Sequence, residues 1–391
     1  MSNFYVPRFI TAEVLASSKE YPILTISGPR QSGKTTLARH LFGDLPYYNL
    51  ESPEIRDLIQ SDPKAFLSQN AQGAILDEIQ RVPALLSYLQ VKVDENKDCR
   101  FIITGSNQFS LLEKVTQSLA GRTAILKLLP FSFGEIAEVA PDLSADELIF
   151  KGSLPTIHAE GRQPTRAYRN YYETYVERDL RLLINIKDIS LFRKFMKLCS
   201  GRTGQVFNAN QLATETGVAG NTIKSWLSVL ETSFIVYLLP PWHGNINKRL
   251  VKSPKLYFYD VGLAAYLLGI QNPSQVQRDP LRGALFENLV INEIIKKFYN
   301  SGLDADIFFY RDKHGNEVDV LLPMAQKIIP IEIKSSETYH SEFLRGLQYF
   351  RKVNPLKTLQ PILVYGGSEE LKSEEISIVN FKKIYREVVL E

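Results

Sequence analysis

The stretch from residue 28 to residue 36, GPRQSGKTT, has the composition and spacing of a site for a phosphate chain. A glycine is followed, after four residues, by Gly-Lys-Thr. Glycine permits the tight curl that points backbone N–H groups at an anion, lysine adds charge, and a hydroxyl is a ligand for Mg²⁺. The residues expected to contact the phosphates or their metal are Gly28, Pro29, Arg30, Gln31, Ser32, Gly33, Lys34, Thr35 and Thr36.

The neighbouring residues give this stretch a structural context. Residues 21–27, YPILTIS, are apolar and partly β-branched, which predicts a buried strand. Residues 35–42 place apolar side chains on one face of a helix. A glycine-rich turn between strand and helix predicts a P-loop for a nucleoside triphosphate, with Lys34 at the β and γ phosphates and Thr35 on Mg²⁺. The alternative is a glycine-rich turn that carries a lysine by chance.

An acidic pair predicts the second half of the site. Residues 73–80, GAILDEIQ, form an apolar strand that ends at Asp77 and Glu78. Ligands of open α/β sheets gather at the carboxyl ends of the strands. We expect Asp77 to hold Mg²⁺ through water and Glu78 to orient or deprotonate the attacking water. Alone, the pair would be read as solvated acids at a strand end.

Further candidates follow along the chain. Residues 100–107 form a strand ending in Ser106 and Asn107, which are candidates to bond the γ phosphate or the attacking water, or else to cap a turn. Arg122 precedes a strand at 123–130 and is a candidate for the arginine that stabilises a nucleotide in a neighbouring subunit, or else a surface or ion-paired arginine. With a short strand at 47–50, these elements predict a parallel sheet with helices on both faces.

These motifs carry a resemblance. The segments GPRQSGKT, AILDEIQ, FIITGSN and SLAGRT, followed by LPFSFGE, resemble those of the AAA+ ATPases. With YVERDL at 175–180, the chain is similar to a bacterial and archaeal family in which an AAA-type domain precedes a C-terminal domain of unknown function. The resemblance implies an ATPase core at 1–132 that uses ATP and Mg²⁺. Its catalytic residues would be Glu78, Lys34 and Arg122, the last acting within a homo-oligomer. The alternative is a slowly hydrolysing, ATP-bound switch that presents a docking surface.

The middle of the chain predicts two helical segments. Residues 133–190 have a helical pattern and are expected to form a lid or linker. Residues 191–270 predict a winged helix-turn-helix, because a glycine turn separates two short amphipathic helices and two strands follow. In a DNA-binding role, Asn221, Thr222, Lys224 and Ser225 would face the groove, and Lys248 and Arg249 would touch phosphates. The alternative is a protein-docking module.

Residues 278–391 contain a possible second metal site. A helix carries Glu287, a predicted hairpin strand carries Asp319, and Glu332 and Lys334 share one face of the next strand. This set resembles the PD-(D/E)xK nuclease core, an α/β fold in which the three acids would collect Mg²⁺ and the lysine would position water. The Gln-x-x-x-Tyr helix motif of some such nucleases is missing. The alternatives are an ATP-licensed nuclease and a silent fold whose charges form an ion network.

Composition limits the remaining possibilities. The 391 residues are 44% hydrophobic and 23% charged, which is typical of a globular protein. The two cysteines, Cys99 and Cys199, argue against a disulfide framework and favour a reducing cytoplasm. The longest apolar run, at 233–242, is about half the length of a membrane span, and the first residues do not form a signal peptide. A net charge of +3 permits a DNA partner but does not require one.

Overall fold

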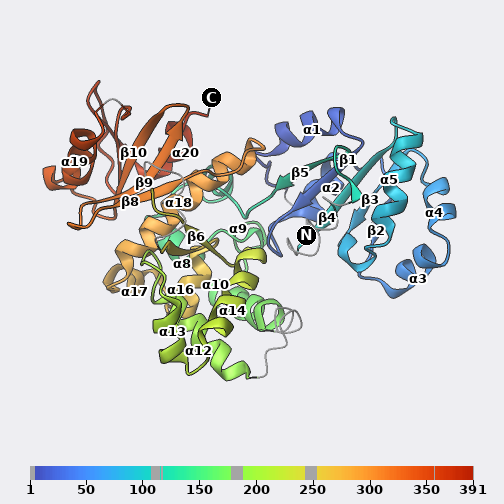
Figure 1. Cartoon of the computed structure of the whole chain (residues 1–391), viewed down its shortest axis with the longest axis horizontal. Helices are drawn as coiled ribbons and strands as arrows, with labels where there is room; N and C mark the ends of the chain where they lie inside the picture. The colour runs from blue at the N-terminus through green and yellow to red at the C-terminus, as the bar shows by residue number, and fades with distance from the viewer. Residues whose placement is uncertain are drawn as a thin grey trace. The chain divides into compact units, whose positions relative to one another are not determined.

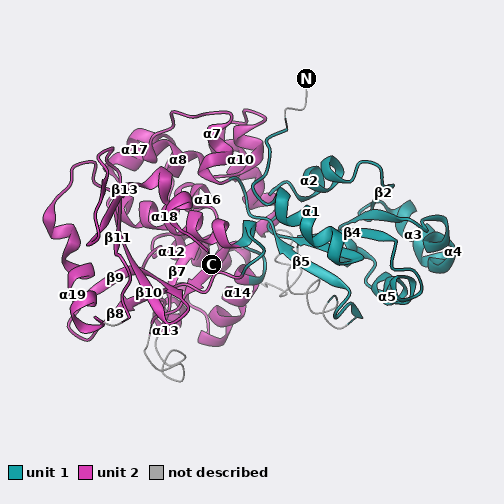
Figure 2. Ribbon diagram, turned by 90° about the horizontal axis from the view of Figure 1, so that it is seen from above, with its two compact units in different colours: residues 1–131, 232–234, 299–303 teal, residues 132–231, 235–298, 304–391 magenta. Residues whose placement is uncertain are grey.

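The computed structural model describes residues 5–106, 115, 118–177, 188–242, 253–355 and 357–390. The chain divides into two compact units, coloured separately in Figure 2. Unit 1 consists of Met1–Phe131, Thr232–Phe234 and Tyr299–Leu303, and unit 2 contains the rest. Among the described residues, no helix combines the length and the apolar character needed to cross a membrane.

Unit 1 is built on a five-stranded parallel sheet (Figure 1). Its strands lie in the order β2-β3-β4-β1-β5. They are β1 Ile23–Ser27, β2 Tyr47–Asn49, β3 Gly73–Asp77, β4 Arg100–Gly105 and β5 Thr123–Lys127. The helices are α1 Thr11–Glu20, α2 Lys34–Leu41, α3 Pro53–Ser61, α4 Pro63–Gln69, the 3₁₀ turn η1 Ile79–Arg81 and α5 Leu85–Glu95.

Alternating side chains of these strands enter two separate cores. Leu24 and Ile26 of β1 pack with Leu37 of α2 and with residues of α1. Ile23 of the same strand belongs to the other core, with residues of α3, α4 and α5. Since successive strand residues point to opposite faces, apolar positions on both faces require helices on both sides. The predicted parallel sheet with helices on both faces is confirmed.

The strand order determines which side chains meet at the carboxyl edge. Strand β4 lies between β1 and β3. Its Thr104 pairs with Ile26 of β1, and the preceding Ile103 pairs with Leu76 of β3. The loop after β1 and the acids at the end of β3 therefore lie on either side of the end of β4.

Unit 2 begins with helices. They are α7 Phe133–Ala137, α8 Ala145–Lys151, α9 Pro155–His158, α10 Pro164–Tyr171, the π-helical turn η2 Tyr172–Glu177, α12 Ile189–Ser200, α13 Ala209–Thr216 and α14 Gly220–Thr232. A left-handed Gly217 ends α13, and α14 buries Ile223, Trp226, Leu227 and Leu230. The antiparallel strands β6 Val236–Leu239 and β7 Lys255–Phe258 follow. These elements match the predicted helix-turn-helix and strands; their identity as a DNA-binding winged helix stays a prediction.

The rest of unit 2 is a mixed six-stranded sheet with its helices. The order is β12-β13-β11-β10-β9-β8. The strands are β8 Phe308–Arg311, β9 Glu317–Met324, β10 Lys327–Lys334, β11 Ile362–Tyr365, β12 Leu371–Lys372 and β13 Ser377–Asn380. The helices and 3₁₀ turns are α16 Val261–Leu267, α17 Pro273–Arg278, α18 Arg282–Asn300, η3 Ser341–Leu344, α19 Arg345–Val353, η4 Phe381–Lys383 and α20 Ile384–Glu387.

The predicted hairpin is present in this sheet. Strands β8 and β9 pair antiparallel around the turn at 312–316. Leu347 and Phe350 of α19 pack against one face of the sheet, in a core shared with Leu321 and Leu363. A C-terminal α/β domain therefore exists, as the sequence predicts, while its identity as a nuclease relative is not established by this topology.

A buried carboxylate connects three helical segments of unit 2. Asp260 accepts hydrogen bonds from the Tyr168 hydroxyl of α10 at 2.7 Å and from Gly262 N of α16 at 2.8 Å. It also accepts from the backbone N (3.1 Å) and hydroxyl (3.2 Å) of Ser153, which precedes α9. Four donors on one buried carboxylate should make this residue a major source of stability for unit 2.

We therefore expect Asp260→Ala to destabilise unit 2 by about 3 kcal/mol, because buried donors would lose their acceptor. Asn272→Ala is a control, since exposed Asn272 caps α17 through one hydrogen bond to Gln275 N and should cost about 1 kcal/mol. Urea unfolding of the full chain, followed by circular dichroism, measures both. Equal losses in the two variants would contradict the proposed role of Asp260.

Candidate functional site

The loop between β1 and α2 adopts a curled backbone that depends on glycine. Gly28 has φ +148°, and a Cβ built on it would lie 2.1 Å from the carbonyl oxygen of Leu128. Gly33 has φ +93° and is the N-cap of α2. Any side chain at Gly28 would collide with backbone, and left-handed φ at Gly33 favours glycine. Both predicted glycines are therefore required by the geometry of the loop.

The Lys34 side chain folds back over this loop. Its ammonium donates to the carbonyl oxygens of Gly28 at 3.0 Å and Pro29 at 2.8 Å, and the residue is only 5% exposed. Burial lowers the pKa of Lys34 to about 8, although the nearby carboxylates of Glu78 and Asp77 act in the opposite direction. These hydrogen bonds go to neutral carbonyl groups, so an anion entering the loop would favour the charged form of Lys34.

Arg8 holds the loop in place through hydrogen bonds to its backbone. Its guanidinium donates to the carbonyl oxygens of Ser32 and Leu129, each at 2.7 Å, and lies 4.9 Å from the centre of the Phe131 ring. Arg8 is 5% exposed. A planar guanidinium that bonds two backbone segments holds the loop against the residues that follow β5. Sequence reasoning missed this residue, because no local pattern marks it.

Asp77 receives hydroxyl groups from three different elements. Thr35 at the start of α2 donates to its two carboxylate oxygens at 3.1 and 3.0 Å. Tyr47 of β2 donates at 2.8 Å, and Thr104 of β4 also donates to it. Burial, followed by the bond to Asp77, raises the pKa of Tyr47. Sequence reasoning missed Tyr47 and Thr104, which the strand order brings beside Asp77.

The donor set of this region fits a Mg²⁺–phosphate ligand. The Thr35 hydroxyl and the Asp77 carboxylate are adjacent oxygen ligands of the type that Mg²⁺ prefers. The hydroxyl of Ser32, inside the loop, is buried and has no hydrogen-bond partner among the described residues. A buried hydroxyl without a partner is costly unless an acceptor reaches it. The loop thus leaves a donor available for a phosphate oxygen.

Glu78 is held in an uncommon backbone conformation. Its φ and ψ of 58° and 48° are left-handed, which is costly for a non-glycine residue and concentrates at functional sites. Its carboxylate accepts from the Ser106 hydroxyl at 3.1 Å and also from the Gln80 side chain, and its backbone N donates to the Thr104 hydroxyl at 3.3 Å. The two predicted residues, Glu78 and Ser106, are therefore in direct contact.

The remaining predicted contacts of the loop are less central. Gln31 and Thr36 are exposed, Pro29 is buried, and Arg30 lies 3.8 Å from the carboxylate of Glu51. Asn107 lies outside the described residues.

Arg122 does not reach the loop of its own chain. It precedes β5, its carbonyl accepts from Ile23 N at the start of β1, and its guanidinium pairs with Asp94 at 2.7 and 2.8 Å. The loop follows the carboxyl end of β1, whereas Arg122 lies beside the amino end of that strand. Arg122 is therefore at the opposite end of the strands from the loop. Its proposed action on a neighbouring subunit stays a prediction.

The second predicted constellation, in unit 2, forms an ion network. Lys334 bonds Glu332 at 2.5 Å, and Asp319 accepts from Ile333 N at 2.8 Å. Burial and then the charge of Asp319 raise the pKa of Glu287 to about 7 and that of Glu332 to about 8. The carboxylates of Glu287, Asp319 and Glu332 therefore influence one another, as the sequence predicts.

A lysine that the sequence analysis did not assign to this cluster belongs to the network. Lys255 of β7 is 4% exposed, and its ammonium lies 3.0 Å from Glu287 and 2.5 Å from Glu317. The hydroxyl of Tyr257 also donates to Glu287. The carboxylates raise the pKa of Lys255, although burial opposes them. An internal ammonium thus neutralises part of the acidic cluster.

The predicted metal site in unit 2 stays a prediction. In the part of the chain that is described, no three or more His, Cys, Asp or Glu side chains are placed so that they could hold a metal ion. Glu332 pairs with Lys334 and Glu287 pairs with Lys255, which favours the alternative of an ion network. Lysine ammonium groups take the place of the expected cation beside Glu287 and Glu332.

The predicted DNA-facing residues of α14 lie on its surface. Asn221, Lys224 and Ser225 are exposed, and Thr222 is half-buried. Lys248 and Arg249 lie outside the described residues.

Comparison with known proteins identifies the family. The chain is 31% identical over 321 residues to the uncharacterized proteins Mb2031c of Mycobacterium bovis and Rv2008c of Mycobacterium tuberculosis, covering 81% of this chain and 71% of each relative. The chain belongs to their family. An uncharacterized protein of Methanocaldococcus jannaschii, MJ1544, is 22% identical over 334 residues, which cover 77% of this chain and 72% of that protein.

Three domain families match successive parts of the chain. Residues 20–137 match an AAA domain, residues 142–274 a domain of unknown function (DUF8612), and residues 282–384 a second domain of unknown function (DUF4143). The N-terminal domain is therefore a P-loop ATPase domain of the AAA type. The first domain of unknown function spans both the expected lid and the expected winged helix.

Two solved structures show weak similarity. A Walker-type ATPase of Pyrococcus abyssi has 15% identity and a TM-score of 0.47, covering 67% of this chain and 96% of its own. A STAND protein of Pyrococcus horikoshii with a tetratricopeptide repeat sensor has 13% identity and a TM-score of 0.25, covering 76% and 48%. Neither similarity is strong enough to support a conclusion.

The pKa of Lys34 predicts how nucleotide affinity depends on pH. Because the free site loses its ammonium proton above about pH 8, affinity for a non-hydrolysable ATP analogue with Mg²⁺ should be constant below that pH. Above it, affinity should fall by up to about tenfold per pH unit. Calorimetric titrations from pH 7 to 9.5 test this. Lys34→Arg is the control, because its guanidinium stays charged; a profile for the natural protein that is flat to pH 9.5 would contradict the assignment.

The position of Lys255 predicts a stability effect. Lys255→Met should destabilise unit 2 by about 3 kcal/mol, because the half-buried carboxylates of Glu287 and Glu317 would lose the buried ammonium that compensates their charge. Lys334→Met should cost less, since its side chain is 34% exposed. Urea unfolding measures both. Full recovery of Lys255→Met by excess Mn²⁺ would show that the carboxylates bind a divalent ion, against the ion-network interpretation.

Proposed function

We propose that the protein is a Mg²⁺-dependent ATPase whose nucleotide state controls unit 2. The observation that carries this proposal is the arrangement of Lys34, Thr35 and Asp77 around a loop whose conformation requires two glycines. The N-terminus of α2 and the loop N–H groups would bind the phosphate chain. Adenine as the base rests on the AAA family of the domain.

Each residue of the site would have a separate role in binding the nucleotide. Lys34 would leave the carbonyls of Gly28 and Pro29 and pair with the phosphate oxygens, which are charged acceptors and therefore stronger partners. Ser32 would donate its buried hydroxyl. Mg²⁺, when bound, would be held by Thr35 and Asp77 and would neutralise phosphate charge. Arg8 would keep the loop in place throughout.

Glu78 would act on the attacking water. Its carboxylate lies one residue beyond Asp77, and Ser106 and Gln80 restrain it through hydrogen bonds. A carboxylate in this position would orient the water and accept its proton. The left-handed backbone of Glu78 supports this role, because the strain must be maintained by the bonds around it.

The proposal also includes contact between unit 2 and DNA. The exposed polar face of α14, with Asn221, Lys224 and Ser225, supports it, although only one lysine adds charge. Turnover measured with and without duplex and single-stranded DNA tests it; strong stimulation is expected. No stimulation, with slow turnover and a monomeric protein, would favour the slowly hydrolysing switch that docks a protein.

Phosphodiester cleavage is not part of the proposal, because the acidic cluster of unit 2 is already ion-paired.

We expect Glu78→Gln to retain ATP binding but to lower kcat by about 10²- to 10⁴-fold, because the amide cannot accept the proton of water. Lys34→Ala should lose binding itself. ATP turnover and calorimetric titration distinguish the two losses. The control is Glu95→Gln, at the end of α5, which should leave both unchanged. Unchanged turnover in Glu78→Gln would remove this residue from the mechanism.

A further inference from the structure

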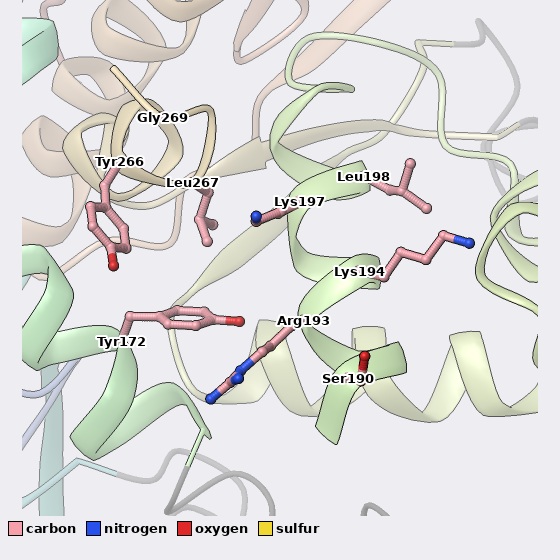
Figure 3. A pocket seen from close by; sticks show the side chains of 9 residues that line it. All are labelled: Tyr172, Ser190, Arg193, Lys194, Lys197, Leu198, Tyr266, Leu267 and Gly269. Carbon is pink, nitrogen blue, oxygen red and sulfur yellow. The ribbon is translucent and has the colours of Figure 1, made fainter. Parts of the chain in front are cut away.

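A pocket in unit 2 lies apart from both the P-loop and the acidic cluster. Its volume is about 560 Å³, within the range of small-molecule sites. Helix α12 forms one wall, and Tyr172 of η2 and Tyr266 of α16 contribute to the other (Figure 3). The size admits a ligand with one ring system and an attached polar group.

Positive charge dominates the wall formed by α12. Arg193, Lys194 and Lys197 line the pocket from this one helix, and Ser190 lies a turn earlier. Arg193 and Lys197 are four residues apart and so share a face. Figure 3 shows both side chains extending toward the tyrosines, while Lys194 points the other way. Three cationic side chains among the lining residues favour an anion as the ligand.

The opposite side of the pocket is aromatic. The rings of Tyr172 and Tyr266 have centroids 6.3 Å apart and planes inclined by 50°. Tyr172 begins a π-helical turn, a geometry that is frequent at functional sites. Aromatic rings next to cationic side chains suit a planar base that carries a phosphate, since the base stacks while the phosphate pairs.

We propose that this pocket binds a nucleoside monophosphate unit, with the phosphate on Arg193 and Lys197 and the base against the tyrosines. The same unit occurs in a free mononucleotide and in single-stranded nucleic acid. The proposal does not depend on the ATPase assignment, because the pocket shares no residue with the P-loop.

The test uses the full chain carrying Lys34→Ala, so that the P-loop does not contribute. Fluorescence anisotropy is measured with labelled AMP and with a labelled oligothymidylate of twelve nucleotides. Binding of either probe supports the proposal, and the probe that binds identifies the source of the unit. Adding Arg193→Gln with Lys197→Gln should weaken this binding at least tenfold, and Tyr266→Leu should weaken it severalfold.

A matched control removes the same charge elsewhere. Arg351→Gln with Lys352→Gln neutralises two exposed cations of α19 and should leave binding unchanged. Circular dichroism checks that each variant is folded. The proposal is overturned if neither probe binds, or if the α19 variant loses as much affinity as the α12 variant, which would indicate attraction by net charge alone.

Discussion

The carboxylate of Asp77 is the interaction on which the nucleotide site depends. It accepts hydrogen bonds from the hydroxyl groups of Thr35 in α2, Tyr47 in β2 and Thr104 in β4. Three elements of unit 1 therefore meet at one carboxylate. Thr104 also accepts from the backbone N of Glu78. The same bonds therefore position the proposed metal ligands and the strained residue beside them. A change in strand order would separate these groups, even if every local motif were kept.

The sequence predicted the members of the site that a local motif contains. Lys34, Thr35, Asp77, Glu78 and Ser106 each follow a strand or begin a helix, so spacing and apolar pattern were enough to place them. Arg8, Tyr47, Gln80 and Thr104 were missed. Tyr47 reaches Asp77 because β2 pairs with β3, and Arg8, which precedes α1, reaches the carbonyl oxygens of Ser32 and Leu129. Contacts between such distant parts of the chain have no signature in a single sequence.

In unit 2, even less of the arrangement of side chains could be predicted from the sequence. Alternating residues predicted the hairpin β8–β9 and the shared face of Glu332 and Lys334. The sequence did not predict that Lys255, in an earlier strand, places its ammonium beside Glu287 and Glu317, because nothing in its surroundings reveals this contact. The boundary expected between lid and winged helix likewise falls inside one domain family.

The charged site around Lys34 in unit 1 and the acidic cluster around Glu287 and Glu332 in unit 2 differ in how readily they would accept a ligand. In unit 1, Lys34 is buried with carbonyl groups as its hydrogen-bond partners, and an incoming phosphate would replace weak partners with strong ones. In unit 2, Glu287 and Glu332 already have ammonium partners, and a metal ion would first have to displace them. A metal ion there would have to compensate the carboxylates at least as well as the ammonium groups do, whereas a phosphate at Lys34 displaces only neutral acceptors. The charge distribution therefore favours ligand binding at the P-loop over metal binding in the acidic cluster.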